Sequence, residues 1–473
     1  MRGLVRTKTI PELIAASEHP NTRLQRSLGV WSLVGLGIGC VIGAGIFTVT
    51  GTAAAGTADR LGAGPGIALS FIIVGIVCGF AGLCYAELAS MIPVAGSSYT
   101  YAYATLGEIF AWIIGWDLIL EYAVANMAVA VGFSAYLNDL LDNAFGIHLP
   151  ASLSNPVLAG GAFTGAIFNL PSFLLLMLLT VILVKGVKES ATANNVMVIV
   201  KLAAILAFIF GAWNAVDSAN WHPFLPNGFA GVLTGAGIVS FAYLGFDSVS
   251  TAAEECINPQ RTMPLGILIT LAICSALYVG VALVLTGIVP WTTLDNAAPV
   301  ANALRTLGYN RLRFIVGVGA LIGMVSSLMI TQYGQARIWF AMSRDRMLPT
   351  IFARVHARYK TPDVSTWIAG IVVGVGAGIF DIGTLADLAN IGTLFAFVVV
   401  SGGVIVLRRT QPHHRRSFRV PWVPVLPLLS IISCGALMVS LPWETWVRFV
   451  VWLVIGLAIY FSYSRKRIEA QGK

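Results

Sequence analysis

Twelve long apolar runs follow one another along the chain, and little polar sequence separates them. A helix needs about 20 mostly apolar residues to cross the hydrocarbon core of a bilayer. Of the 473 residues, 57% are hydrophobic and 11% charged, whereas soluble domains have about 25% charged residues. We therefore expect an all-α polytopic membrane protein and exclude a cytosolic enzyme. The runs lie near 30–55, 65–92, 105–137, 170–187, 194–213, 229–253, 264–289, 312–341, 363–380, 384–407, 421–441 and 445–463.

The basic residues of the loops predict the orientation of these spans. If the N-terminus is cytoplasmic, five arginines fall outside, and the other 24 of the 29 lysines and arginines lie inside or within spans. Basic loops stay in the cytoplasm, so we expect both termini there, in a multi-pass protein of the cell membrane. The net charge of +8 is then an orientation signal and does not indicate a nucleic-acid partner. The outer arginines are Arg60, Arg305, Arg311, Arg313 and Arg448.

The first run contains five glycines between positions 35 and 45. Each glycine weakens a helix by about 1 kcal/mol relative to alanine. Close helix packing explains part of the pattern, because Gly39 and Gly43 form a GxxxG motif. The local cluster Gly43, Ala44 and Gly45 exceeds what packing requires. We therefore predict an unwound stretch at these three residues.

The sixth run has the same character. Small and polar residues occupy its middle, and Asp247 follows directly. We predict a second break around 242–245, about 200 residues after the first, with five spans in each unit. Because five is odd, the second unit must be inserted upside down relative to the first. Paired broken helices in inverted units indicate a secondary transporter with a substrate site at the membrane midplane.

The breaks also predict the chemistry of that site. An unwound segment frees N–H groups at the start of one half-helix, where the positive end of the dipole attracts a carboxylate. It frees C=O groups at the end of the opposing half-helix, and these can accept from an ammonium. A site with both features recognises the zwitterionic head of an α-amino acid.

Several motifs then resemble the amino acid–polyamine–organocation (APC) superfamily, and in particular its bacterial cationic amino acid transporter (CAT) group. They are LGIGCVIGAGIF at 36–47, YAELASMIPVAGSSYTY at 85–101, WDLILEY at 116–122, FDSVSTAAEE at 246–255, NPQR at 258–261 and IGTLFAF at 391–397. The resemblance implies a LeuT-like fold with two inverted five-helix repeats plus two C-terminal helices. The expected segments are a cytoplasmic tail (1–28), the two repeats (29–213 and 229–407), the last helices (420–464) and a cytoplasmic tail (465–473).

The resemblance also implies which residues bind substrate. The ammonium would meet the carbonyls of Val41, Phe241 and Leu244, and the carboxylate would meet the amides of Ala44 and Gly45. Phe241 resembles the aromatic gate over the bound substrate, and Ala44 departs from the Ser or Thr of many relatives. The expected substrate-binding residues are Val41, Ile42, Gly43, Ala44, Gly45, Phe241, Ala242 and Leu244, with Thr331 and Gln332 near the side-chain pocket.

Lys201 is the candidate for coupling to an ion. It lies seven residues into the fifth run, about 10 Å deep, and a lysine snorkelling to the interface is one interpretation. Ionisable groups within a membrane are otherwise functional by default. In related proton-coupled transporters a lysine of this span occupies the place where sodium-coupled relatives bind their ion. The expected coupling ion is therefore a proton, and we expect no metal or other cofactor.

Three acidic residues are further candidates. Asp117 and Glu121 are spaced i,i+4 and so share one face of the third helix, and Asp247 follows the second break. Each could make a structural hydrogen bond to a neighbouring helix. Each could also exchange a proton with Lys201 or neutralise a cationic substrate. Glu121 is the stronger candidate for coupling.

Other functions stay open at this point. Sodium-coupled symport is the near alternative, although a fixed ammonium at Lys201 would compete with sodium, and an exchanger is not distinguished from a symporter. A channel is less favoured because no filter motif or ring of charges occurs. A membrane-embedded enzyme lacks a catalytic motif. The expected partners are an amino acid substrate and membrane lipids, and the sequence says nothing of a small accessory subunit.

Overall fold

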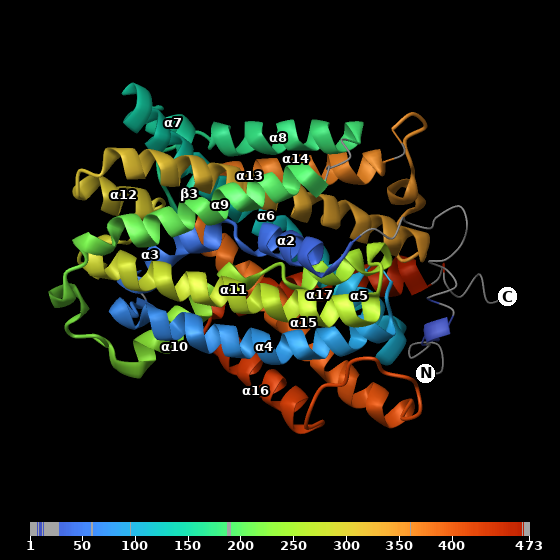
Figure 1. The fold of residues 1–473 in the computed structure, drawn as a ribbon. Coiled ribbons are helices and arrows are strands. Elements are labelled where there is room, and N and C mark those ends of the chain that lie inside the picture. The colour runs from blue at the N-terminus through green and yellow to red at the C-terminus, as the bar shows by residue number, and fades with distance from the viewer. Residues whose placement is uncertain are drawn as a thin grey trace.

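The chain forms a bundle of long helices (Figure 1). A computed structural model describes residues 7, 9–11, 13, 28–57, 60–94, 96–186, 191–359, 361–465 and 467. The predicted tails 1–28 and 465–473 lie largely outside the described residues. Two short antiparallel hairpins accompany the helices, β1–β2 (Gly56–Thr57, Arg60–Leu61) and β3–β4 (Leu158–Ala159, Ala162–Phe163).

The first half of the chain contains the first broken helix. Its elements are α2 (Val30–Val41), the π-helical turn η1 (Gly45–Val49), α3 (Thr50–Ala55), α4 (Ile67–Met91), α5 (Ser97–Thr105), α6 (Glu108–Phe145), α7 (Ala151–Ser154), α8 (Leu170–Lys185) and α9 (Ala191–Ala212).

The second half contains a helix interrupted in the corresponding place. Its elements are α10 (Gly228–Val239), the 3₁₀ turns η5 (Ser240–Tyr243) and η6 (Asp247–Glu255), α11 (Pro259–Ile288), α12 (Pro299–Thr306), α13 (Asn310–Arg344), α14 (Asp363–Ile379), α15 (Ile382–Thr410), α16 (Val425–Val439) and α17 (Trp443–Ile459).

The helix lengths confirm a polytopic membrane protein. Among the described residues, eight helices are long and apolar enough to cross a bilayer, or nine if the bent pair α2–α3 counts as one span. Three shorter apolar helices, α8, α14 and α16, add to these. All twelve predicted runs contain helix. The count of twelve crossings stays a prediction.

The packing places α2 inside the bundle. It contacts α9, α11 and α13, and Figure 1 shows α8 and α16 at opposite edges of the bundle. The most extensive helix contacts join α13 to α6 and α11 to α4. The broken segments therefore lie where helices from both halves of the chain meet, and this is the region that can hold a site.

A buried ion cluster fixes the end of α4 that the charge pattern places in the cytoplasm. The Glu87 carboxylate accepts from Arg408 Nε and Nη2 at 2.8 and 2.7 Å and from Arg416 Nε at 3.2 Å. It also accepts from the backbone amide of Val420 at 2.7 Å. These bonds tie the end of α15 and the loop between α15 and α16 to α4, so Arg408 of α15 and Arg416 of the loop have a structural role.

Candidate functional site: a cavity between two broken helices

The first helix breaks where its glycines cluster. Helix α2 ends at Val41, Ile42 leaves the helical region with φ −82° and ψ 88°, and Ala44 is helical again. The two halves are bent by 44°. A break is confirmed at this place, but the unwound residues are Ile42 and Gly43. The prediction that Ala44 and Gly45 are also unwound is wrong, because both already belong to the helical path of the second half. A Cβ atom on Gly45 would overlap the backbone of Ala242, so this glycine lets the two breaks approach each other.

The second break lies within the predicted stretch 242–245. Helix α10 ends at Val239 and continues as the 3₁₀ turn η5. Leu244 is extended with ψ 142°, and Gly245 has φ +99°, a conformation that favours glycine. The chain resumes a helical path at Asp247. The second predicted break is therefore confirmed.

Side chains from other helices satisfy the carbonyl groups at the end of α2. Lys201 Nζ donates to the carbonyls of Gly39 and Ile42 at 2.8 and 2.9 Å. Ser327 Oγ donates to the carbonyl of Cys40 at 2.9 Å. The last carbonyls of a helix have no partner within it and carry the negative end of the dipole. Lys201 is 0% exposed, so it caps this helix end, and the snorkelling interpretation is wrong.

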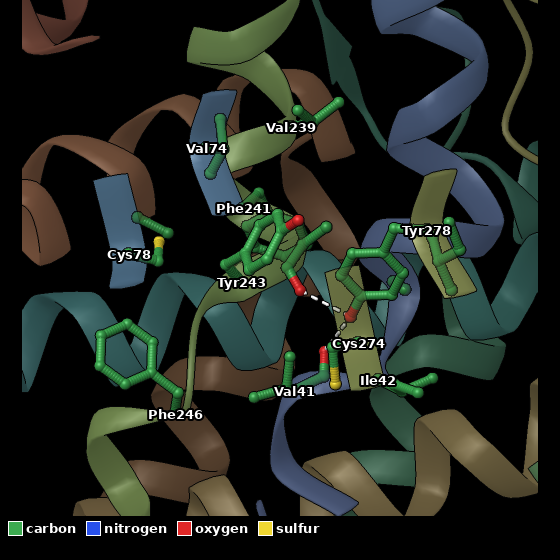
Figure 2. Packing of buried hydrophobic residues seen from close by; sticks show 14 of the residues in the cluster. Val41, Ile42, Val74, Cys78, Val239, Phe241, Tyr243, Phe246, Cys274 and Tyr278 are labelled. Atoms are coloured by element: carbon green, nitrogen blue, oxygen red, sulfur yellow. Dashed lines mark hydrogen bonds between the residues drawn. The ribbon is translucent and has the colours of Figure 1, made fainter. Parts of the chain in front are cut away.

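Tyr278 of α11 joins the two breaks. Its hydroxyl lies 3.1 Å from the carbonyl oxygen of Val41 and 2.8 Å from that of Ala242. Figure 2 shows Tyr278 directed toward Val41, and its ring packs against that of Tyr243. A hydroxyl has one proton, so at any moment it donates fully to only one of the two carbonyls. Tyr278 was not predicted from the sequence, where its only signal is that it is the one tyrosine of an apolar run.

A cavity of about 40 Å³ lies between the breaks. Eight predicted residues line it: Val41, Gly43, Ala44, Gly45, Glu121, Phe241, Leu244 and Thr331. Tyr122, Ser248 and Ser327 also line it and were not predicted. The Tyr122 and Ser248 hydroxyls are hydrogen-bonded at 2.6 Å. A water molecule needs roughly 10–15 Å³ measured in this way, so the cavity holds a few waters and must widen for a larger solute.

Ile42 and Ala242, two of the other predicted binding residues, belong to the breaks but do not line the cavity. The Ile42 carbonyl accepts from Lys201, and the Ala242 carbonyl accepts from Tyr278. The structure does not bring Gln332 to the cavity, because its Nε2 donates to Thr180 Oγ1 of α8 at 2.7 Å. A residue next to Thr331 on a helix points about 100° away from it, and this separates Gln332 from its neighbour.

The three acidic candidates are buried close to the site. Glu121 lines the cavity, Asp117 lies one turn away on α6, and Asp247 begins η6. Both Asp117 oxygens, Glu121 Oε2 and Asp247 Oδ1 accept no hydrogen bond within the described part of the chain. An unsatisfied buried acceptor costs about 1–3 kcal/mol. Packing alone does not explain these carboxyl groups.

Comparison with known proteins agrees with this geometry. The sequence model of the amino acid permease family matches residues 28–461. The chain is 49% identical to the methylthioribose transporter of Bacillus subtilis, over 98% of this chain and 99% of that protein. It is 47% identical to the branched-chain amino acid permease BcaP of the same bacterium, over 98% of this chain and 99% of BcaP. It is 34% identical to cationic amino acid transporter 9, chloroplastic, of Arabidopsis thaliana, over 98% of this chain and 92% of that transporter.

Proposed function

Because the chain belongs to the amino acid permease family, we propose that it imports amino acids across the cell membrane by alternating access, with a proton as the coupling ion. Its relatives are transporters, so the membrane-embedded enzyme is excluded. The observation that carries the proposal is the cavity at the junction of two broken helices, lined by both breaks.

The proposed site binds the substrate head through the backbone. The ammonium binds the carbonyls of Val41, Phe241 and Leu244, and the carboxylate binds the amides of Ala44 and Gly45. The lining of the cavity supports this arrangement, because all five residues face it. Phe241 is the gate that covers the substrate.

The proposed substrates are cationic or a broad range of L-amino acids. Ala125 and Val129 give the cavity apolar walls, and Glu121 and Thr331 add polar ones. Two relatives are named for branched-chain and cationic amino acids. A third is named for methylthioribose, so this thioether sugar is the second candidate substrate.

Lys201 and Glu121 are the proposed coupling residues. When Lys201 carries its proton, the ammonium neutralises the negative end of the α2 dipole. Loss of that proton leaves a neutral amine, which keeps two N–H donors for the carbonyls of Gly39 and Ile42 but bonds to them more weakly. Proton transfer therefore changes the stability of the first break, where substrate binds. The ammonium occupies the carbonyl groups that a sodium ion would need. Sodium coupling and exchange are the alternatives.

We propose the LeuT-like arrangement for the whole chain, with repeats at 29–213 and 229–407, two further helices at 420–464 and both termini in the cytoplasm. The eight long helices, the bent pair and the three short apolar helices of the described residues would make twelve crossings if each of them spans the membrane. The breaks at corresponding places in the two halves support the inverted repeat.

Uptake into proteoliposomes tests the proposal. Unlabelled amino acids and methylthioribose would compete with labelled L-leucine and L-arginine, with and without an imposed pH gradient, in sodium or choline buffer. We expect uptake of at least one amino acid, stimulated when the outside is acidic and indifferent to sodium. Uptake of labelled methylthioribose with no uptake of either amino acid would favour the second candidate, and a sodium requirement would reject proton coupling.

A further inference from the structure

A second cavity, of about 290 Å³, lies at the ends of α6 and α12. The proposed orientation places these ends outside the cell. The cavity is larger than the one between the breaks, which measures about 40 Å³. Its polar lining includes Asn138, Asp139 and Asp142 of α6 and Asn302 and Arg305 of α12. His148, Ser154, Asn155 and Asn169 from the region between α6 and α8 complete it.

One wall of this cavity carries an unbalanced negative charge. Arg313 Nη2 lies 2.6 Å from Asp139 Oδ1 and 3.0 Å from Asp142 Oδ2, and Arg313 Nε also donates to Asp139. Two carboxylates therefore share one guanidinium, which leaves a net charge of −1. The side chain of Asp142 is 29% exposed and that of Asp139 is 9% exposed. The unbalanced charge is therefore accessible at Asp142.

The α12 wall of the same cavity carries a positive charge. Arg305 lies in the last turn of α12 and is exposed. Its guanidinium forms no ion pair within the described ranges of the chain. A simple anion or cation in this cavity would leave one wall unpaired. A zwitterion would pair with both walls, its ammonium at Asp142 and its carboxylate at Arg305, with asparagine amides between them.

We propose that this external cavity is a second binding site for the zwitterionic amino acid that the central site takes, and this inference rests on the proposed function for its ligand class and orientation. The cavity is well placed to pass substrate on, because α12 packs against η1 and α3, the second half of the first broken helix. The imidazole of His148 would compete with the ammonium of the bound amino acid for the Asp142 carboxylate. Its Nδ1 lies 3.4 Å from Asp142 Oδ1, and its side chain is 76% exposed, so it can move aside.

The test is a count of bound amino acids on the full chain in lipid nanodiscs, made with labelled L-leucine and L-arginine in equilibrium binding. We expect two sites per chain in the wild type. Arg305→Gln should lose the outer site or weaken it at least tenfold, and Arg305→Lys should restore much of the affinity. Gly45→Val should remove the central site and leave the outer one.

Arg311→Gln is the matched control, because Arg311 is also exposed on the outer side but does not line the cavity. It should keep both sites. A stoichiometry of one in a wild type that transports the same amino acid would overturn this inference and leave the proposed function intact. Two sites that persist in Arg305→Gln would also overturn it. A wild type that neither binds nor transports an amino acid would instead defeat the proposed function.

Discussion

At the scale of single residues, the site depends on polar atoms that complete the broken helices. The carbonyls at the end of α2 receive hydrogen bonds from Lys201, Ser327 and Tyr278. A helix end left without partners in an apolar interior would be costly. When one of these side chains moves away, the carbonyl that it leaves can accept a hydrogen bond from a ligand. The side chains that stabilise the break therefore also control whether a ligand can bind there.

Lys201→Ala should abolish proton-driven accumulation. Without the ammonium, the carbonyls of Gly39 and Ile42 lose their donor, and no proton is carried at this position. An inward gradient of one pH unit, coupled one proton to one substrate, supports about tenfold accumulation of substrate inside proteoliposomes. In the variant we expect the inside and outside substrate concentrations to become equal. Lys185→Ala, at the end of α8, is the control. Wild-type accumulation in Lys201→Ala would reject this coupling role.

Tyr278→Phe should slow transport without unfolding the protein. The change removes a hydrogen bond worth about 1 kcal/mol, so we expect roughly a fivefold lower uptake rate. Tyr243→Phe is the matched control. Its ring lies 5.3 Å from that of Tyr278, yet its hydroxyl bonds to the Phe71 carbonyl and Ser275, away from the breaks. Equal losses in both variants would contradict a specific role for Tyr278.

The sequence predicted backbone contributors better than side-chain partners. Gly43, Ala44, Gly45 and Phe241 line the cavity because their own segment forms it. Tyr278 comes from another helix, and its role depends on packing that one sequence does not reveal. Gln332 was wrongly predicted to lie near the side-chain pocket. It follows Thr331, which lines the cavity, but its own side chain faces α8.

At the scale of the elements, glycine spacing determined where the helices open. This is a local property, so the sequence predicted both breaks. The π-helical turn η1 was not predicted, because one of the hydrogen bonds to its carbonyl groups comes from a distant helix. Tyr136 of α6 donates to the carbonyl of Phe47 at 2.6 Å, and Thr50 Oγ1 donates to that of Ile46 at 3.0 Å. In a regular α-helix these carbonyl groups would accept from backbone amides of the same helix. Here side-chain hydroxyls donate to them.

Gly45→Val should abolish uptake while the protein still inserts into the membrane. Its side chain would overlap Ala242 and separate the two breaks. Ala44→Pro should have the same effect, because proline removes the amide proposed to bind the carboxylate. Uptake per amount of membrane-inserted protein is the measurement. Gly79→Val is the control, since a Cβ there meets nothing within 4 Å. Normal uptake by Gly45→Val would show that substrate binds elsewhere.

At the scale of the whole molecule, the polytopic helical architecture and the positions of the apolar helices along the chain followed from hydropathy, because a lipid environment requires long apolar helices. The arrangement of those helices did not follow from it. The contacts of α2 with α9, α11 and α13 join segments far apart in the sequence. The central position of α2 is a property of the packed bundle.

Reporter fusions test the predicted orientation. A fluorescent protein at the C-terminus should fluoresce, and alkaline phosphatase at the same place should be inactive, because basic segments remain in the cytoplasm. Alkaline phosphatase fused after Gly160, in the exposed hairpin β3–β4, should be active. The reverse pattern would invert the proposed topology and place the second cavity on the cytoplasmic side.

The most direct measurement is a cryo-electron microscopy map of the chain in nanodiscs with a transported amino acid bound. We predict density for the amino acid between the two breaks, its carboxylate within hydrogen-bonding distance of the Ala44 and Gly45 amides and its ammonium beside the Val41 carbonyl. Continuous helical density through Ile42–Gly43 and Leu244–Gly245, or an amino acid bound only away from these turns, would contradict the account.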